Sequence, residues 1–296
     1  MKYLSIDIGG TYIKYAILNE NLVLTDHRKK QTKTTSKRAL FQQIEQIIKE
    51  IMEKYNISGI GISTAGIVDR ALGKIVYAGP TLPFYKGMEW KQPLIEKFSV
   101  PVVVENDVNA ALLGEKWKGS MIDKNNIFCI TIGTGIGGAY YNHQLIDGAF
   151  QQANSVGYLL YDPATGTNYE SRASTNALIS KIKESLDDTV TPETLFERAK
   201  LGCHECLTII HNWAKEIANG LAQIILLYDP KYIVIGGGIS QQGDYLLDFI
   251  QKEIPYYLPE NFLKTKVRMA TLHNHAALYG AIYPFLKESQ APKDAI

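Results

Sequence analysis

Apolar runs along the chain predict strands interleaved with helices. The segments 3–8 and 13–18 are mostly apolar and are separated by a glycine-containing turn, a pattern that is typical of a β-hairpin. A third strand is expected to begin at 22–24, and short apolar runs at 57–62 and 100–105 predict two more. Because segments with helical spacing separate these runs, we expect an α/β architecture of layered strands and helices.

Helical periodicity is clearest in four segments. After Ser36, which can cap a helix, isoleucine and leucine side chains recur three and four residues apart. The segment 107–117 is also predicted to be helical. In the second half, Thr191 followed by Pro192 is typical of a helix start, and 203–228 predicts a long amphipathic helix.

The opening pattern recurs in the middle of the chain. Segment 127–134 can be aligned with segment 3–10 so that apolar residues meet apolar residues and Gly133 meets Gly9. In both copies a glycine-containing turn leads into a second β-like stretch. This weak duplication predicts two similar α/β halves, with a boundary in the polar stretch 116–126.

Composition narrows the class of protein. The 296 residues carry 31 Lys and Arg against 30 Asp and Glu, and this balance gives no whole-chain attraction to nucleic acid or to an anionic membrane. No apolar run reaches the roughly 18 residues of a membrane span, and Asp7 interrupts the stretch where a signal peptide would be apolar. Three cysteines, an odd and low number, do not suggest a disulfide framework. We therefore expect a soluble cytoplasmic protein that binds neither nucleic acid nor membrane.

Three glycine-rich turns follow apolar strands, at 7–11, 133–138 and 236–238. Glycine lets a backbone approach phosphate oxygens closely or adopt positive φ, so such turns can hold phosphates through backbone N–H groups. Each turn alone is more typical of a plain hairpin. The middle one does not fit a dinucleotide-binding motif, because the chain continues after it as a strand. All three together favour a nucleotide site between the two halves.

Two aspartates stand at the ends of predicted strands. Asp7 interrupts an apolar strand, where a carboxylate is costly unless it bonds the next turn, is paired, or faces a metal ion. Asp107 follows the strand at 100–105 and begins a helix, where it is either a plain N-cap or a functional carboxylate. The positive end of that helix is expected to keep Asp107 ionised, with a low pKa. An ionised Asp can accept the proton of a hydroxyl that attacks a γ-phosphate.

The segment Cys203-His-Glu-Cys206, with His211 beyond it, raises the alternative of a zinc site. It lies in the long predicted helix and offers only two cysteines, so four ligands are not evident. We favour cysteines that pack as small hydrophobic residues, and Cys129, in a predicted strand, is interpreted in the same way.

Several motifs then occur in a fixed order. They are Asp7-Ile-Gly-Gly-Thr11, Gly61-Ile-Ser-Thr-Ala-Gly66-Ile-Val-Asp69, Leu82-Pro-Phe-Tyr-Lys-Gly87, Glu105-Asn-Asp-Val-Asn-Ala110, Thr131-Ile-Gly-Thr-Gly-Ile-Gly-Gly138 and Ile233-Val-Ile-Gly-Gly-Gly-Ile-Ser240. With them, the chain from residue 3 to about 281 resembles the ROK family (repressors, open reading frames and kinases). The sugar kinases of this family have an α/β, two-lobed, actin-like ATPase (ribonuclease H-like) fold with a central cleft, which is the fold that the resemblance implies here.

The resemblance further implies a homodimeric kinase that uses ATP and Mg²⁺ to phosphorylate the 6-hydroxyl of a sugar. Asp107 would be the general base, and Asp7 would serve Mg²⁺ through water. The sugar would contact Gly66, Asn106, Asp107, Ser155, Tyr158 and Glu170. ATP and its phosphates would contact Asp7, Gly9, Gly10, Thr11, Lys14, Gly133, Thr134, Gly135, Gly236, Gly237 and Gly238. Residues 1–116, completed by a helix at 275–290, would form the sugar and phosphate side, and 117–274 the nucleotide side.

Two departures from the family pattern bear on the substrate. The family's Glu-x-Gly-His corresponds to Ser155-Val-Gly-Tyr158, and 161–166 lacks the family's cysteine cluster, so we predict no structural zinc. Losing a carboxylate and an imidazole near C1 and C2 removes hydrogen-bond partners for the hydroxyls of a free sugar. A serine and an aromatic tyrosine there suit a substituted sugar. The prediction is a β-glucoside such as cellobiose, with N-acetylmannosamine or glucose as alternatives.

Two alternatives belong to other functional classes. A sugar-responsive repressor of the same family would need a DNA-binding module, but the first lobe's strand already begins at Tyr3. An actin-like ATPase that acts on no sugar would hydrolyse ATP alone. An assay with and without sugar separates the ATPase from a sugar kinase. A non-catalytic sugar sensor does not fit the presence of both aspartates.

Overall fold

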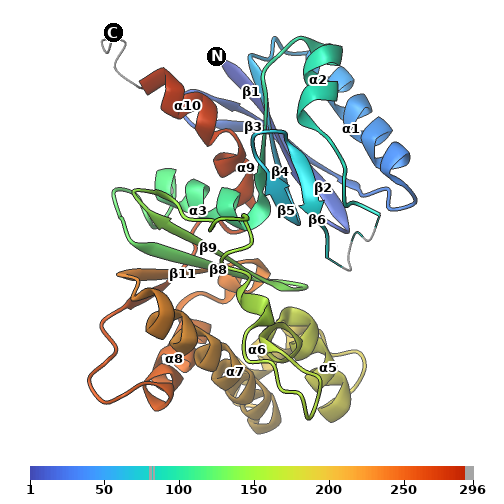
Figure 1. Ribbon diagram of the computed structural model, residues 1–296. Helices are drawn as coiled ribbons and strands as arrows, with labels where there is room; N and C mark the ends of the chain where they lie inside the picture. Colours follow the sequence, from blue (N-terminus) through green and yellow to red (C-terminus); the bar gives the residue numbers. More distant parts are fainter. Residues whose placement is uncertain (80–81, 83, 291–296) are drawn as a thin grey trace. The chain divides into compact units, whose positions relative to one another are not determined.

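The computed structural model describes residues 1–79, 82 and 84–290. The chain forms two compact units, which Figure 1 shows with the helices and strands labelled. Unit 1 comprises Met1–Ile122, Gly148–Gln152 and the chain from His275 onward, and unit 2 comprises Asp123–Asp147 and Ala153–Asn274.

Unit 1 is built on a five-stranded sheet with the strand order β3-β2-β1-β4-β7 (Figure 1). β2 runs antiparallel to β1 and β3, whereas β4 lies parallel between β1 and β7. The carboxyl ends of β1, β4 and β7 therefore meet at one edge of the sheet. The strands span Lys2–Ile8 (β1), Tyr12–Asn19 (β2), Leu24–Gln31 (β3), Gly59–Thr64 (β4) and Val102–Asn106 (β7).

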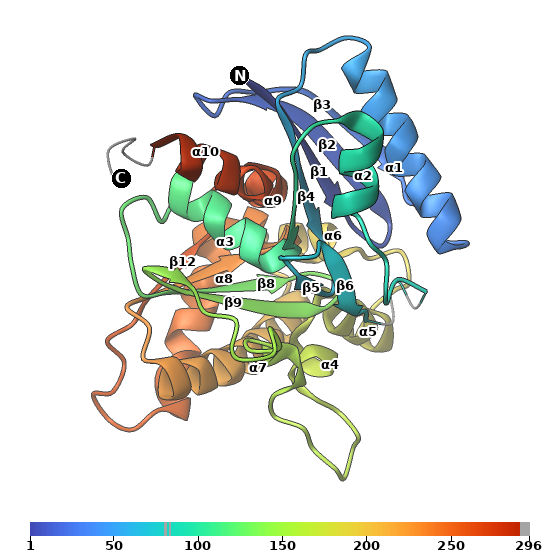
Figure 2. The same cartoon turned by 45° about the horizontal axis from the view of Figure 1, so that its top comes forward.

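Helices cover both faces of this sheet (Figure 2). The apolar stripe of α1 (Lys37–Met52) packs with the even-numbered residues of β1 in one buried cluster. Because successive strand residues point to opposite faces, Ser5 faces the other side. There its hydroxyl donates to the carbonyl of Leu278 in α9 (Ala276–Ala281) at 2.7 Å. The end of β1 is thus held in a packed layer.

α3 (Asp107–Trp117) lies directly against α9. The approach is close enough that a Cβ at Gly280 would overlap the carbonyl of Ala110, and one at Gly114 would overlap the carbonyl of Ala276. Glycine at both positions lets the two helix backbones touch, which fixes where α3 begins. The other elements of unit 1 are β5 (Ile67–Asp69), β6 (Lys74–Tyr77), α2 (Lys91–Phe98) and α10 (Tyr283–Gln290).

Unit 2 repeats the sheet topology of unit 1 with the order β10-β9-β8-β11-β12. β9 is antiparallel to β8, and β11 lies parallel between β8 and β12. The strands span Ile127–Ile132 (β8), Ile136–Asn142 (β9), Gln144–Leu145 (β10), Tyr232–Gly236 (β11) and Lys266–Met269 (β12). The duplication seen in the sequence therefore corresponds to two sheets of the same design.

A long helix, α7 (His204–Tyr228), forms the centre of the unit 2 core. Its buried side chains, among them Trp213, pack with residues of β8, β11 and the neighbouring helices in one cluster. The other helices are α4 (Tyr169–Ala173), α5 (Thr175–Ser185), α6 (Pro192–Lys200) and α8 (Gly243–Glu253), with 3₁₀ turns η1 (Val156–Tyr158), η2 (Gly238–Gln242), η3 (Ile254–Tyr257) and η4 (His273–His275).

The elements with strong periodicity or caps are confirmed. Ser36 and Thr191 cap α1 and α6 through their side chains, and α3 has the predicted bounds. The third strand begins at Leu24, because Leu22 has positive φ and belongs to the preceding turn. The short elements β5, β6, α2 and β12, and the 11-residue helix α8, were not predicted from the sequence. No helix in the described ranges is long and apolar enough to span a lipid bilayer.

Candidate active site

Asp7 lies one residue before the end of β1, and the sheet register determines its partners. Asp7 is opposite Lys14 in β2 and opposite Ser63 in β4. The Ser63 hydroxyl donates to Asp7 Oδ1 at 2.8 Å, and Lys14 Nζ lies 3.7 Å from Oδ2. Burial raises the pKa of Asp7, and the lowering effects of Lys14 and Ser63 do not cancel it. Asp7 is therefore a mostly buried carboxylate with incompletely compensated charge.

Asn106 and Asp107 lie where β7 passes into α3. Asn106 is the N-cap, since its Oδ1 accepts from the N–H groups of Val108 at 2.9 Å and Asn109 at 3.1 Å. Its Nδ2 donates to Asp107 Oδ1 and to the carbonyl of Gly66, each at 2.9 Å. Asp107 is the first helical residue, so the alternative of Asp107 as a plain N-cap is wrong. Asn106 both caps the helix and orients the Asp107 carboxylate.

The pKa of Asp107 is raised to about 7, which contradicts the expectation of a low value. Burial is the larger cause, and the negative charge of Asp7 is the second. Hydrogen bonds from Asn106 and the helix start act in the opposite direction and are outweighed. The helix N-terminus stabilises the ionised form, but removing a carboxylate from water beside another carboxylate costs more.

Glu105, the residue before Asn106, is buried and stabilises the start of α3 through hydrogen bonds. Its Oε1 accepts from the Asn106 N–H at 2.9 Å and from Asn109 Nδ2 at 3.0 Å, while Arg70 Nη1 lies 3.5 Å from Oε2. Burial raises the pKa of Glu105, and Arg70 lowers it. The sequence analysis quoted Glu105 within a motif but gave it no role. The available signal was a charge that directly follows an apolar run.

Gly66 lies on the turn after β4 and has a φ of +97°. A side chain there would bring a Cβ to 2.5 Å from the carbonyl of Tyr77, so the turn requires glycine. Below the turn, the hydroxyls of Thr64 and Tyr85 are 2.5 Å apart, and Trp90 Nε1 donates to Tyr85 at 2.9 Å. This buried network supports the Gly66 turn. Part of the motif 82–87, at residue 83, lies outside the described residues.

The turn between β1 and β2 contains Gly9, Gly10 and Thr11. The Gly9 N–H donates to the Tyr12 carbonyl at 3.1 Å, and the Thr32 hydroxyl donates to the Gly9 carbonyl at 2.7 Å. Thr11 is exposed. The hydrogen bonds at Gly9 thus fix the turn, while Thr11 stays exposed.

The corresponding turn in unit 2 contains Gly133, Thr134 and Gly135. The Gly133 N–H donates to the Gly135 carbonyl at 2.9 Å, Thr134 is exposed, and a Cβ at Gly133 would meet no atom within 4 Å. At Gly135 a Cβ would lie 2.5 Å from the Glu170 carboxylate, so this glycine makes room for Glu170. Glu170 Oε2 accepts the Ile136 N–H at 2.7 Å. The structure therefore joins Glu170 to the glycine-rich hairpin.

Ser155 is the N-cap of the 3₁₀ turn η1 and Tyr158 is its last residue, and η1 packs against α4, which carries Glu170. Ser155 and Tyr158 are both exposed, with Tyr158 at 56%. Gly157 between them is buried, and a Cβ there would come within 3.2 Å of Glu170 Oε2. The turn that carries Ser155 and Tyr158 therefore lies next to the Glu170 carboxylate.

The third glycine-rich turn, Gly236–Gly238, follows β11. Gly237 has a φ of +87°, and a Cβ there would overlap the carbonyl of Ile132 at the end of β8. Gly238 is exposed with nothing near its Cβ direction. Within unit 2, this turn therefore lies against the end of β8 that leads into the turn of Gly133.

The predicted site residues thus form two groups. Unit 1 carries Asp7, Gly9, Gly10, Thr11, Lys14, Gly66, Asn106 and Asp107, whereas unit 2 carries Gly133, Thr134, Gly135, Ser155, Tyr158, Glu170, Gly236, Gly237 and Gly238. Within each group the turns and polar side chains gather at strand ends. The convergence of the two groups on one ligand stays a prediction.

The cysteine predictions are partly confirmed. Cys129 and Cys206 are buried, as expected, but Cys203 is only half-buried and forms the N-cap of α7. His211 contacts Glu253, with Nε2 3.5 Å from Oε1.

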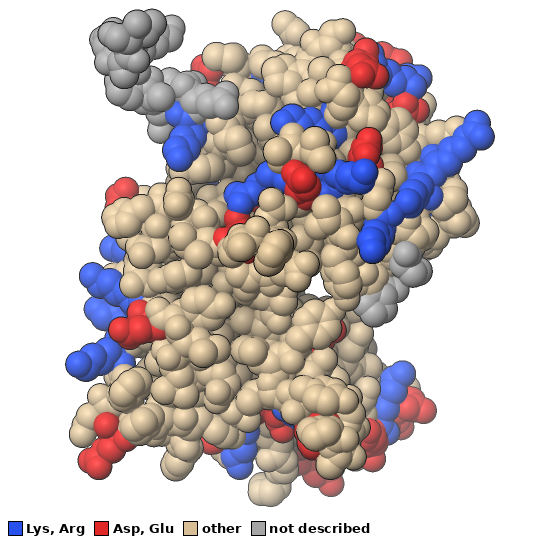
Figure 3. All heavy atoms as spheres, in the orientation of Figure 1, with Lys and Arg blue, Asp and Glu red and all other residues tan. Residues whose placement is uncertain are grey.

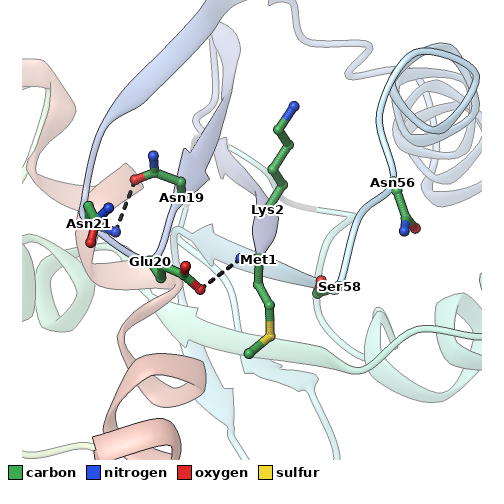
Figure 4. Close-up of a pocket in the computed structure, with 7 residues that line it drawn as sticks. All are labelled: Met1, Lys2, Asn19, Glu20, Asn21, Asn56 and Ser58. Carbon is green, nitrogen blue, oxygen red and sulfur yellow. Dashed lines mark hydrogen bonds and ion pairs between the residues drawn. The ribbon is translucent and has the colours of Figure 1, made fainter.

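A further pocket of unit 1 lies away from these candidate residues. Figure 4 shows an open pocket at the start of β1, where the terminal ammonium pairs with Glu20 at 2.7 Å. It lies at the opposite end of the strand from Asp7 and is lined by Met1, Lys2, Asn19, Glu20, Asn21, Asn56 and Ser58. On the face drawn in Figure 3, basic and acidic side chains are interspersed.

Comparisons with known proteins agree with this geometry. The chain is 30% identical to a β-glucoside kinase of Klebsiella pneumoniae, with 99% of each protein covered. It is also 30% identical to a glucokinase of Streptomyces coelicolor, over 94% of this chain and 95% of the relative. A solved ROK family glucokinase from Streptomyces griseus, in complex with glucose and AMPPNP, has a TM-score of 0.84 at 26% identity, covering 95% of this chain and 98% of that chain.

The predicted fold class is confirmed, because the matched structures are sugar kinases with the actin-like ATPase fold. The model of the ROK family matches residues 3–288, nearly the whole chain. This chain therefore belongs to the ROK family.

Proposed function

We propose that this protein is an ATP-dependent sugar kinase that transfers the γ-phosphate to the 6-hydroxyl of a hexose or β-glucoside. The observation that carries the proposal is the Asp107 carboxylate, held by Asn106 at a strand-to-helix junction with its pKa raised to about 7. A base whose pKa lies near neutral pH is well matched to proton transfer. The kinases among the similar proteins support the same class of reaction.

Asp107 acts on the attacking hydroxyl. As the hydroxyl oxygen forms its bond to the γ-phosphorus and the bond to ADP breaks, the hydroxyl proton passes to the Asp107 carboxylate. The transition state is loose, so the proton moves late and positioning matters more than basicity. The Asn106 amide keeps Asp107 oriented, and Glu105 fixes the backbone of Asn106.

Asp7 fits the requirements of a Mg²⁺ site. Mg²⁺ is held in kinases by one or two carboxylates, with waters and substrate phosphates as further ligands. Asp7 is mostly buried and raises the pKa of Asp107, which shows that this region has an excess of negative charge. Asp7 would hold the ion through water, and the ion would neutralise charge on the phosphates. Lys14 would add a second positive charge beside Asp7.

The glycine-rich turns would bind the nucleotide. Open space beside Gly133 and Gly238 leaves their backbones accessible to phosphate oxygens, whereas a side chain would block that approach. Thr11 and Thr134 are exposed on their turns and can donate hydroxyl hydrogen bonds. These contacts assume that the two units close on one ligand.

The proposal is tested with Asp107→Asn, which keeps the size and one carbonyl oxygen of the side chain. The kcat of sugar phosphorylation should fall by roughly 10²–10⁴ if Asp107 is the base. Asp244→Asn is the matched control, since Asp244 also lies in the first turn of a helix after a sheet strand. The control should keep kcat within about twofold of wild type. ADP formation measured with sugar gives the rate of phosphorylation, and ADP formation without sugar gives the rate of ATP hydrolysis alone.

Two outcomes would remove the proposal. Turnover like wild type in Asp107→Asn, with near-ultraviolet circular dichroism unchanged, would exclude Asp107 as the base. ATP hydrolysis that does not depend on any sugar would favour the alternative of an actin-like ATPase that acts on no sugar.

For the substrate, we favour a β-glucoside over glucose. The turn with Ser155 and Tyr158 packs next to Glu170, and the exposed Tyr158 ring would offer an aromatic surface to a group attached at C1. Aromatic packing of this kind contributes about 0.5–1.5 kcal/mol. Glucose is the second candidate, because the Klebsiella pneumoniae β-glucoside kinase and the Streptomyces coelicolor glucokinase are equally similar to this chain at 30% identity.

Substrate choice is tested with cellobiose, an aryl β-glucoside, glucose and N-acetylmannosamine. The kcat/KM for both β-glucosides should exceed that for glucose, and Tyr158→Ala should lower it by about 3–10-fold while leaving glucose unchanged. Tyr161→Ala is the control, because Tyr161 is also an exposed tyrosine but lies outside η1. A preference for free glucose, or equal effects of the two variants, would refute the assignment.

A further inference from the structure

Two thiols share the first turn of α7 in unit 2. Cys203 is the N-cap, and Cys206 follows three residues later. Residues three apart at the start of a helix lie on the same side of it, so the two side chains are neighbours. The third cysteine, Cys129, is buried in β8.

The two thiols differ in access to solvent. Cys206 is fully buried in the unit 2 core, but Cys203 is half-buried at the corner between α6 and α7. Leu201, just before it, is 89% exposed, and Gly202 has a φ of +91° with open space beside its Cα. A small reagent can reach Cys203 from this corner and cannot reach Cys206.

Their acidities differ in the same direction. The nearby backbone N–H and thiol of Cys206 lower the pKa of Cys203, because they favour its thiolate. Burial, followed by the bond to Cys203, raises the pKa of Cys206 to about 11. The thiolate is the reactive form of cysteine, so Cys203 is the nucleophile of the pair.

A metal site does not fit the same residues. A structural zinc takes four ligands, and only two sulfurs meet here. His211 is engaged with Glu253, and the described part of the chain holds no group of three or more potential metal-ligating side chains. The pair therefore has the chemistry of a dithiol.

We propose that Cys203 and Cys206 form a redox-active dithiol that is oxidised reversibly to an intramolecular disulfide by a low-molecular-weight disulfide. The Cys203 thiolate attacks one sulfur of the small disulfide, forms a mixed disulfide and releases one small thiolate. Cys206 then loses its proton and attacks the Cys203 sulfur, which releases the second small thiolate. The two electrons lost by the protein reduce the small disulfide to two thiols.

The bond requires only a local adjustment. Side chains three residues apart on a helix have Cβ atoms about 5–6 Å apart. A disulfide needs about 3.5–4.5 Å. Cys203 lies outside the helical hydrogen-bond ladder except through its carbonyl, which accepts from Leu207 at 3.0 Å, so this end can close without unwinding α7.

The test incubates the full chain with oxidised glutathione, then digests it with trypsin. Both cysteines fall in one predicted tryptic peptide, 201–215. This peptide should lose two hydrogen atoms in mass and regain them with dithiothreitol. Cys206→Ser should instead accumulate one glutathione adduct on Cys203, and Cys203→Ser should leave Cys206 unmodified. Cys129 is the internal control in every sample and should stay reduced.

Each arm can overturn the proposal. A peptide 201–215 that stays reduced, or that carries only glutathione adducts in the wild-type chain, excludes the intramolecular bond. Reaction of Cys206 as fast as Cys203 in the single variants contradicts the assigned order of attack. Because the main result is read on the wild-type chain, a variant that folds poorly does not decide the outcome.

Discussion

The two sheets share one design, but they carry different chemistry at the same strand ends. In both, a central strand turns through glycine into an antiparallel partner and pairs on its other side with one parallel strand, which in turn pairs with a second. The next-to-last residue of the central strand is Asp7 in unit 1 and Thr131 in unit 2. The last parallel strand leads to Asp107 in unit 1 and to the apolar Ala270 in unit 2. The shared fold provides positions, and the residues at those positions determine the function.

The electrostatic character of the two units differs accordingly. The carboxylates of unit 1 are mostly buried, so the pKa values of Asp7 and Asp107 are raised. In unit 2 those positions hold no carboxylate, and the candidate carboxylate is Glu170, which comes from α4 and accepts a backbone N–H of the glycine hairpin. The carboxylates of unit 1 therefore form a site where a proton or a cation can bind. Unit 2 instead has turns whose backbone is accessible.

The largest effect that tests this difference is expected from paired substitutions at the two equivalent positions. Asp7→Asn should lower kcat/KM by roughly 10²–10³, because it removes the charge that would hold the cation and its phosphates. Thr131→Val, at the matching place in β8, should stay within about threefold of wild type. Steady-state kinetics with the best sugar substrate and ATP measures both.

The same two variants can also contradict the proposed difference between the two strand ends. Equal losses in both variants would mean that the two strand ends contribute similarly to catalysis. A change confined to the KM for sugar in Asp7→Asn would mean that Asp7 binds the sugar and not the nucleotide side of the reaction.

Much of the fold was predictable because its signals are local. Periodicity located α1, and the cap at Thr191 located α6. The repeated hairpin pattern indicated two similar halves. Most of the missed elements are short, such as β12 with four residues, and depend on neighbours that are distant in sequence.

The candidate residues could be named from the sequence, but their surroundings and pKa values could not. Motifs pointed to Asp7 and Asp107, yet only the register shows that Asp7 meets Lys14 and Ser63. The pKa of Asp107 depends on burial and on a charge 100 positions earlier in the chain, and neither is visible in a local pattern. Glu105 was missed for the same reason, because its role consists of contacts to Asn109 and Arg70.

A second prediction concerns the acid limb of the pH–rate profile. The base must be ionised to accept a proton, so kcat/KM should fall about tenfold for each pH unit below the Asp107 pKa, and should level off above about pH 7. A discontinuous assay of ADP, with sugar and nucleotide both limiting, avoids the pH limits of coupling enzymes. A flat profile between about pH 5.5 and about pH 8 would contradict the raised pKa or the role as base.

The smallest effect is expected on stability, and it has a definite sign. The folded-state pKa of Asp107 is about 7, above the unfolded value near 3.9, so the folded state binds a proton more tightly. This contribution to stability is complete below about pH 4 and is lost as the pH rises through about 7.

Asp107→Asn does not titrate and should therefore become more stable than wild type as the pH increases, by on the order of 2 kcal/mol between about pH 5 and about pH 8. Urea unfolding at both pH values measures the difference, and Asp244→Asn, an exposed aspartate in the first turn of α8, should show none. If the stabilities of Asp107→Asn and wild type change with pH in parallel, the pKa of Asp107 is not raised in the folded protein, and burial in unit 1 does not prepare this carboxylate for proton transfer.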